Sequence, residues 1–212
     1  MSYKKISKHV FKKFSEKEGN MHIASDFAIE EILRIVKDHN PKNILEVGLG
    51  IGSISDAVTA YLNFLKLEIK YSGTEENAFC LRQLPQNVAA FSHITLYSSI
   101  NDIPVGNFFD LIIVDGSDQS LTEIKRYCNR NTLIFIEGGR DSQVRILKKI
   151  FPKAIMSRLM SLRRPPSYGP FQQRWSGGAT LIAIYPTKKQ RYYIFKEKVK
   201  TFTKRRLRRI LN

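Results

Sequence analysis

Strand-like and helix-like segments alternate along most of this 212-residue chain, and that alternation limits the fold more than any single motif does. Runs rich in aliphatic and β-branched residues predict strands at residues 43–47, 69–74, 94–98, 109–115, 132–137, 154–160 and 179–185. Strands that alternate with helices form a parallel sheet covered on both faces. We therefore expect an α/β, Rossmann-like three-layer sandwich.

The spacing of apolar residues also predicts the helices that cover the sheet. Such spacing occurs at 3–14, from Ser25 to the His39-Asn40-Pro41 stop, and at 53–66, 77–84, 120–128 and 140–150. The last two strands are joined by SLRRPPSYGPFQQRWSGG, a connection without a helix, and a pair joined in this way is most simply antiparallel. We expect a seven-stranded, mostly parallel sheet whose last strand is antiparallel.

The net charge of +16 is concentrated at one end of the chain. From Lys188 onward there are 11 Lys and Arg residues against one Glu, which gives +10, and the remaining 24 basic and 18 acidic residues give +6. This division predicts a basic amphipathic tail at 188–212 that is an appendage of the fold. Lysines between apolar residues at helical spacing predict a basic amphipathic segment at 1–19, and the folded domain is expected at 20–187. The N-terminus lacks a secretion signal's apolar core, so we expect a cytoplasmic protein.

The stretch NILEVGLGIGS at 43–53 ends the first strand with an acidic residue and three alternating glycines, Glu46, Gly48, Gly50 and Gly52. Glycines in this turn of a doubly wound sheet let the backbone approach a ligand closely, although tight turns also need glycine for steric reasons alone. A pyrophosphate site usually has its third glycine where this chain has Ser53. A carboxylate favours a cationic ligand, and S-adenosylmethionine carries a sulfonium and an ammonium without a phosphate.

The predicted sheet, with five parallel strands, a sixth and a reversed seventh, resembles that of class I S-adenosylmethionine methyltransferases from about residue 20 to 186. Glu75 lies at the end of the second strand, where an acidic side chain accepts hydrogen bonds from both ribose hydroxyls. Its neighbour Glu76 is the weaker candidate. The resemblance places Ser98 and Ser99 where the family contacts the adenine, and a plain turn is the alternative for these serines.

Three segments resemble one branch of that family, which includes the catechol and caffeoyl-CoA O-methyltransferases and sugar-modifying relatives. They are NMHIASDFAIEEIL, ILEVGLGIGS and LIIVDGSD. In many members an aspartate after the fourth strand and an Asp-Asn pair after the fifth hold Mg²⁺. Asp115 matches the first ligand, Glu137 departs from the pair, and Asp118 stands where some members carry a lysine base. The resemblance thus implies a Mg²⁺ site at Asp115, Glu137 and Asp118.

The same residues are the candidates for the chemical step. Asp115 either binds a divalent cation or accepts the proton of the acceptor directly, with Glu137 and Asp118 as helpers. His22 is a further candidate base, because its segment is expected to lie over the cofactor. Carboxylates at strand ends can also be structural and cap the next helix, and His22 can equally be a packed or exposed residue.

The connection between the last two strands emerges on the active-site side of the predicted sheet. Its arginines, Arg163, Arg164 and Arg174, offer forked donors for carboxylate or phosphate, and Tyr168 and Trp175 offer flat faces for a sugar or a base. We expect these five residues to bind the acceptor. The alternative is a solvated loop stiffened by prolines.

The tail carries an apolar stripe flanked by basic residues: Tyr192, Phe195, Val199 and Phe202, continued by Leu207 and Ile210. A cationic amphipathic helix of this kind fits an anionic membrane surface. The alternatives are RNA, which binds basic tails through its phosphates, and an apolar face docked on the core or on a partner subunit.

The sequence thus favours an S-adenosylmethionine-dependent methyltransferase. Its expected acceptor is a hydroxyl on a glycan, a lipid-linked saccharide or a related acidic metabolite, at the inner membrane surface. One alternative is an RNA methyltransferase that grips phosphates with the tail. The other is a catalytically silent binding module that keeps the cofactor fold.

Overall fold

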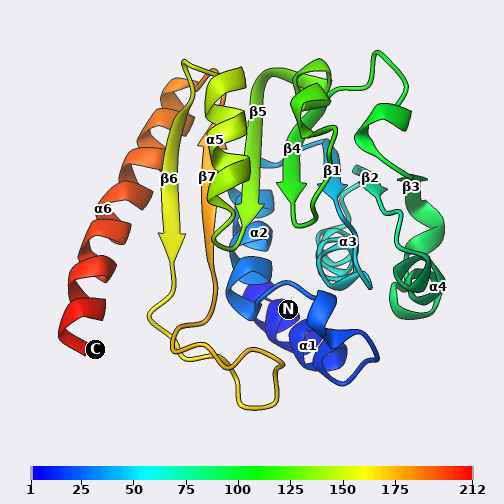
Figure 1. Cartoon of the computed structure of the whole chain (residues 1–212), viewed down its shortest axis with the longest axis horizontal. Helices are drawn as coiled ribbons and strands as arrows, with labels where there is room; N and C mark the ends of the chain where they lie inside the picture. Colours follow the sequence, from blue (N-terminus) through cyan, green and yellow to red (C-terminus); the bar gives the residue numbers. More distant parts are fainter. Residues whose placement is uncertain (1, 212) are drawn as a thin grey trace.

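A computed structural model describes residues 2–211, and within this range the chain forms one seven-stranded sheet (Figure 1). The strands are β1 Asn43–Val47, β2 Lys70–Thr74, β3 Ile94–Tyr97, β4 Phe109–Val114, β5 Cys128–Glu137, β6 Ile155–Met160 and β7 Gly178–Ala183. Their order is β3-β2-β1-β4-β5-β7-β6. β7 runs antiparallel to β5 and β6, and the other neighbours pair in parallel. The predicted fold class is confirmed, including the reversed last strand.

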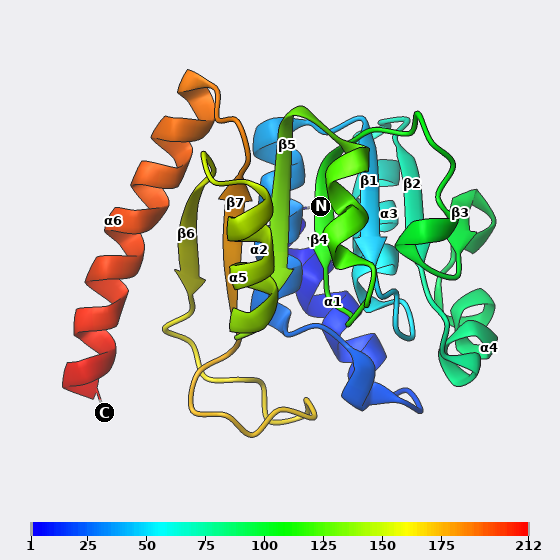
Figure 2. The ribbon, with the colours of Figure 1, turned by 45° about the horizontal axis from the view of Figure 1, so that its top comes forward.

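The helices lie on both faces of this sheet (Figure 2). They are α1 Tyr3–Ser15, α2 Asp26–His39, α3 Ser53–Leu65, α4 Ala78–Asn87, α5 Asp141–Ile150 and α6 Lys188–Leu211, with short 3₁₀ helices η1 Asn20–His22, η2 Phe91–His93, η3 Ile100–Asp102 and η4 Leu121–Tyr127. α1, α2 and α3 pack on one another, and α5 packs with η4. The result is the expected three-layer sandwich.

The two core layers follow from the alternation of side chains along the central strands. Leu111 and Ile113 of β4 are buried in the cluster that includes α1, α2 and α3. Ile112 and Val114 are buried in the cluster that includes η4 and α5. The last four residues of β4 are all apolar and point alternately to the two faces, so this part of the strand needs a helical layer on each face.

One connection differs from the sequence prediction. The segment 120–128 forms the 3₁₀ helix η4, and β5 begins at Cys128, earlier than the predicted 132. Side chains hold this early start, because Thr132 Oγ1 donates to the Phe109 carbonyl at 2.6 Å and Asn129 Nδ2 donates to Asp110 Oδ1 at 2.7 Å. The β4–β5 register shifts at the same place.

The basic tail forms α6, which packs along β6 and is not a detached appendage (Figure 1). Its inner face buries Ile194 and three polar residues, among them Glu197. Arg34 Nη1 of α2 lies 3.1 Å from Glu197 Oε1 and ties the helix to the domain. Among residues 2–211, no helix is both long and apolar enough to cross a membrane. The domain boundaries at 19/20 and 187/188 stay a prediction.

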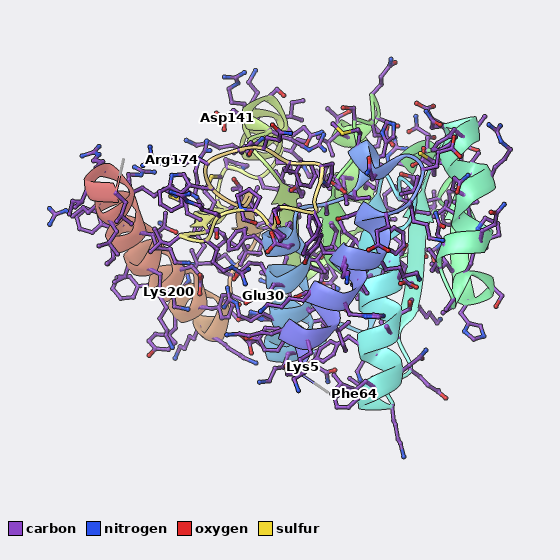
Figure 3. The ribbon with its side chains drawn as sticks, turned by 90° about the horizontal axis from the view of Figure 1, so that it is seen from below. Lys5, Glu30, Phe64, Asp141, Arg174 and Lys200 are labelled. Atoms are coloured by element: carbon purple, nitrogen blue, oxygen red, sulfur yellow. The ribbon has the colours of Figure 1, made fainter. Side chains whose placement is uncertain are left out.

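The N-terminal segment packs on the domain in a similar way. Phe14 of α1 has no exposed surface and belongs to the same core cluster as α2 and α3. We expect Phe14→Ala to lower the free energy of unfolding by about 3–5 kcal/mol, because it leaves a cavity in this core. Phe64→Ala is the matched control, since Phe64 at the outer end of α3 is 48% exposed (Figure 3), and it should change stability by less than about 0.5 kcal/mol. Urea unfolding measures both, and equal losses would contradict a core role for α1.

Candidate active site

A cavity of about 1540 Å³ opens at the carboxyl edge of the sheet, at the lower side of Figure 1. Its walls come from the turns after β1, β2, β4 and β5, from the η1 segment, from the loop between β6 and β7, and from α6. The structure brings most of the predicted cofactor and catalytic residues to this one cavity: His22, Gly48, Gly50, Glu75, Ser98, Ser99, Asp115, Asp118 and Glu137. Glu46 and Gly52 are not among the described residues that line it.

The turn after β1 requires glycine, because a side chain at Gly48 or Gly50 would clash with neighbouring backbone. Gly48 and Gly50 have φ angles of 83° and 55°, in the left-handed region that favours glycine. A Cβ at position 48 would lie 2.4 Å from the Cα of Gly116, and one at position 50 would lie 2.6 Å from the carbonyl oxygen of His22. The turn therefore lies directly against the turn after β4 and against the η1 segment.

Glu75 is fixed at the end of β2 by two backbone amides. Its Oε2 accepts a hydrogen bond from Gly50 N at 2.7 Å, and its Oε1 accepts one from Asn77 N at 2.8 Å. A carboxylate has about four acceptor positions, so both oxygens can still accept from ribose hydroxyls.

Ser99 has its own partner in the chain. Its N and Oγ both donate to Asp102 Oδ2 at 2.9 Å, as the plain-turn alternative requires.

Glu46 lies behind the cavity wall. Its side chain has no exposed surface, and Tyr71 Oη donates a hydrogen bond to its Oε2. Its Oε1 has no hydrogen-bond partner among the described residues. Burial raises the pKa of this carboxyl group well above its usual value. The predicted direct contact of Glu46 with a cofactor therefore has no support in this geometry.

Asp115 and Glu137 form a half-buried carboxyl pair beside Arg140, an arginine that the sequence analysis did not single out. Burial, and next the charge of Glu137, raises the pKa of Asp115 to about 7, although Arg140 opposes the shift. Arg140 Nη2 lies 3.4 Å from Asp115 Oδ1 and also donates to the Asp115 carbonyl. Arg140 Nε donates to the Glu137 carbonyl at 3.2 Å. A basic residue three positions after the acidic end of β5 was the available signal.

Glu137 is also tied to the segment that precedes β1. Ser25 Oγ lies 3.2 Å from Glu137 Oε1 and donates to it, and the same hydroxyl oxygen accepts the Ala28 amide at the start of α2. Burial raises the pKa of Glu137. Glu137 therefore also has a structural role at the start of α2, which was the alternative considered for carboxylates at strand ends.

The donor groups do not fit a Mg²⁺ site. Asp118 Oδ1 accepts from Ser120 N at 2.7 Å, and its Oδ2 accepts from Ile100 N at 3.1 Å, so this carboxylate holds the η3 and η4 connections. No cluster of three His, Cys, Asp or Glu side chains suited to a metal occurs in residues 2–211. Arg140 already supplies a positive charge to Asp115 and bonds the backbone carbonyl of Glu137. The Mg²⁺ expectation is not supported.

The five predicted acceptor residues are not among the described residues that line the main cavity. Arg163 pairs with Glu30 at 2.8 Å and with Asp26 at 3.7 Å, which fastens the loop to α2. Tyr168 packs on the Phe11 ring, with centroids 6.1 Å apart. Arg164 and Arg174 line a separate hollow of about 520 Å³, and the Trp175 ring lies 5.2 Å from the Arg208 guanidinium. Other residues of this loop reach the cavity instead: Pro165, Phe171, Gln173 and Ser176.

No protein-family model and no curated protein sequence matches this chain. Solved structures do match. An O-methyltransferase from Bacillus cereus in complex with S-adenosylhomocysteine has 13% identity and a TM-score of 0.60, with 85% of this chain and 90% of that chain covered. The fold is that of class I S-adenosylmethionine methyltransferases.

Two further solved structures have the same fold and are described as other kinds of methyltransferase. A candidate RNA methyltransferase from Pyrococcus horikoshii has 12% identity and a TM-score of 0.58, with 85% of this chain and 98% of that chain covered. A candidate caffeoyl-CoA O-methyltransferase from Staphylococcus aureus has 16% identity and a TM-score of 0.53, with 76% and 85% covered. At these identities the likeness shows the fold alone.

The side of this methyltransferase-fold cavity that α6 contributes is basic, which the sequence analysis missed. Arg205 and Arg208 of α6 and Arg158 of β6 line it. Arg158 pairs with Asp141, and Arg208 donates from Nε and Nη2 to the Ser161 carbonyl at 2.9 and 2.6 Å. The described residues give Arg205 no hydrogen-bond or ion-pair partner. Arg205 and Arg208 continue the helical spacing of the inner face from Thr201, and that was the available signal.

The raised pKa of Asp115 makes the stability of the fold depend on pH. The folded protein holds this proton up to about pH 7, whereas the unfolded chain loses it near the usual value of 3.8, so stability falls as pH rises through that window. Asn keeps the shape without the charge. The free energy of unfolding of Asp115→Asn, relative to that of the wild type, should therefore rise by about 2–3 kcal/mol as the pH goes from 5 to 8, since each pKa unit corresponds to about 1.4 kcal/mol.

Urea unfolding at the two pH values measures this gain. Asp141→Asn is the matched control for the loss of one charge, because Asp141 lies exposed at the start of α5 (Figure 3). A gain for Asp115→Asn that is the same at both pH values would contradict the assignment.

Proposed function

We propose that this protein transfers a methyl group from S-adenosylmethionine to a hydroxyl of an anionic acceptor. The observation that carries the proposal is the position of Asp115, a half-buried acid with a raised pKa, in the same cavity as the glycine turn and Glu75. These groups come from the ends of three neighbouring strands, β4, β1 and β2. Ligands of open α/β sheets bind at that edge.

The cofactor lies across the glycine turn in this proposal. Glu75 accepts the ribose hydroxyls, because its carboxylate is held in place by Gly50 N and Asn77 N and still has acceptor positions free. Ser98 and Ser99 line the cavity beyond Glu75 and border the adenine. The methionine end lies over Gly48, whose missing side chain leaves room for it.

Asp115 serves as the base for the acceptor. The acceptor oxygen attacks the methyl carbon as the carbon–sulfur bond breaks, and the hydroxyl proton passes to the Asp115 carboxylate. A base with a pKa of about 7 is matched to this task near neutral pH. Arg140 positions the carboxylate through its contacts with Asp115, and the charge of Glu137 helps to raise the pKa of Asp115. In-line placement of the two reactants supplies much of the rate.

His22 and Asp118 line the same cavity, but neither is needed as the base. Asp118 is engaged by Ser120 and the Ile100 amide. His22 lies in η1, whose backbone touches the glycine turn. We assign His22 to the cover of the cofactor.

The basic wall supports an anionic acceptor. Arg158, Arg205 and Arg208 line the cavity on the side of β6 and α6, and Arg205 has no partner among the described residues. Guanidinium groups bind phosphate and carboxylate through paired donors. This wall favours an acidic glycan, a lipid-linked saccharide or a related acidic metabolite.

RNA is the second candidate acceptor. The net charge of +16 favours a polyanion, and the Pyrococcus horikoshii structure is named as a candidate RNA methyltransferase. The carboxylate base at the end of β4 supports hydroxyl transfer in either case. The two candidates differ in the fraction of a cell extract that receives the methyl group.

Cofactor binding is tested at Glu75. We expect Glu75→Ala to weaken S-adenosylmethionine binding by about tenfold or more, because hydrogen bonds to a charged acceptor are worth about 1.5–3 kcal/mol. Titration calorimetry measures the change. Glu76→Ala is the matched control, since Glu76 is the next carboxylate on the same cavity wall and should have little effect. A larger loss from Glu76→Ala would move the ribose contact to that residue.

Turnover is tested with labelled S-adenosylmethionine and fractionated extract of the source cell. We expect label in a glycan or lipid fraction, unchanged by EDTA, and lower at pH values below about 7, where Asp115 is protonated. Asp115→Asn should reduce transfer by about 100-fold or more without weakening cofactor binding. Nuclease-sensitive label would identify RNA as the acceptor. Cofactor binding without label in any fraction would indicate the silent binding module.

A further inference from the structure

The apolar stripe of α6 faces away from the protein. Tyr192, Phe195, Val199 and Phe202 are 65%, 62%, 50% and 58% exposed, and Ile210 near the end of the helix is 78% exposed. Figure 1 shows α6 at one side of the molecule, beside β6 at the edge of the sheet. These side chains lie on one face at the spacing of an α-helix. They form what we call the outer face of α6.

The inner face of α6 is mostly polar. Its buried residues are Gln190, Ile194, Glu197 and Thr201. Specific polar contacts hold this face, because Glu197 pairs with Arg34 at 3.1 Å and Lys204 Nζ donates to the Met160 carbonyl at 2.7 Å. The helix thus docks on the domain through polar contacts and the apolar residue Ile194, and its apolar stripe stays outside. The outer face is a contiguous exposed apolar patch of the kind that marks an interaction site.

Basic side chains lie on the rings of the outer face. Lys196 Nζ is 5.3 Å from the Tyr192 ring centroid, and the Arg206 guanidinium is 4.5 Å from that of Phe202. Long basic side chains in this arrangement place their stems on apolar surface and their charges in water or at a headgroup. Aromatic and aliphatic residues among Lys and Arg are the composition of helices that lie in a membrane interface.

We propose that the outer face of α6 docks this protein on an anionic membrane surface. Charge selects this occupant, because the chain from Lys188 onward carries a net charge of +10. A second copy would place the same +10 against it. Anionic headgroups neutralise the charge while the acyl region takes up Phe195 and Phe202.

Docking in this way also positions the cavity. The last turns of α6 carry the outer-face residue Ile210 and, on the cavity side, Arg205 and Arg208. A headgroup layer held against the outer face therefore lies about one helix diameter, roughly 10–12 Å, from the basic wall. In the part that rests on the proposed function, a lipid-linked acidic acceptor reaches the cavity from that layer. Docking itself does not require methyl transfer.

The test uses the full chain with sedimented vesicles of phosphatidylcholine alone and of phosphatidylcholine with phosphatidylglycerol. We expect binding to the anionic vesicles, little binding to the neutral ones, and weaker binding at higher salt. Phe195→Ser with Phe202→Ser should lower the vesicle partition coefficient by about tenfold or more, because both rings leave the interface. Phe64→Ser with Phe108→Ser is the matched control, since these phenylalanines are 48% and 51% exposed on other elements, and this pair should bind as the wild type does.

Several outcomes would overturn the proposal. They are equal binding by the two double variants, equal binding to neutral and anionic vesicles, a stable dimer that the Phe195/Phe202 variant disrupts, and binding to RNA but not to anionic vesicles. S-adenosylmethionine binding is measured on the same preparations. If the wild type binds S-adenosylmethionine but not anionic vesicles, the docking proposal fails and the proposed function stands. If the wild type does not bind S-adenosylmethionine, the proposed function fails, whatever the vesicle result.

Discussion

The close approach of two backbone turns sets the geometry of the rest of the site. Gly48 after β1 and Gly116 after β4 lie so near that a Cβ at either position would meet the backbone of the other. With these turns in contact, the neighbouring strands β1 and β4 end side by side, and the residues that follow them face one cavity. The carboxylate of Asp115 can then lie within reach of a ligand held by the glycine turn. The steric and ligand-binding interpretations of these glycines are therefore compatible.

Around that contact the protein concentrates carboxyl groups in a strongly basic molecule. Glu46 is buried, Asp115 and Glu137 are half-buried, and burial raises the pKa of all three. Arg140 is the charged partner that holds Asp115, and Tyr71 and Ser25 bond the other two carboxyl groups. Such a cluster is costly for stability. Perturbed carboxyl groups in a cleft are a common mark of a functional site.

The fold could be predicted from the sequence because its strongest signals are local. Alternating strands and helices, the glycine turn and the helix-free last connection together determine the sheet. Residues at strand ends could also be placed at the cavity, as Glu75, Asp115 and Glu137 show. Glu46 could not, because the alternation along β1 directs it to the same face as Ile44, toward the buried Tyr71.

The long loop and α6 were harder to predict, since what they contact depends on tertiary packing. Arginine is suited to binding a ligand phosphate and equally to pairing with Glu30, and nothing local distinguishes Arg163 from Arg205. Periodicity located the apolar stripe of α6, but an apolar face is ordinarily assigned to the core. Here Arg34 and Glu197 bind the opposite face. A polar anchor of this kind is visible only once both elements are in place.

Ser25 and Asp26 at the start of α2 connect three parts of the protein. Ser25 caps α2 and donates to Glu137, while the next residue, Asp26, accepts from Ser176 and lies 3.7 Å from Arg163 of the long loop. The start of α2 is thus a junction that joins the carboxyl pair to the wall opposite it. Loop and carboxylate therefore share one support, and a change at the start of α2 would alter both at once.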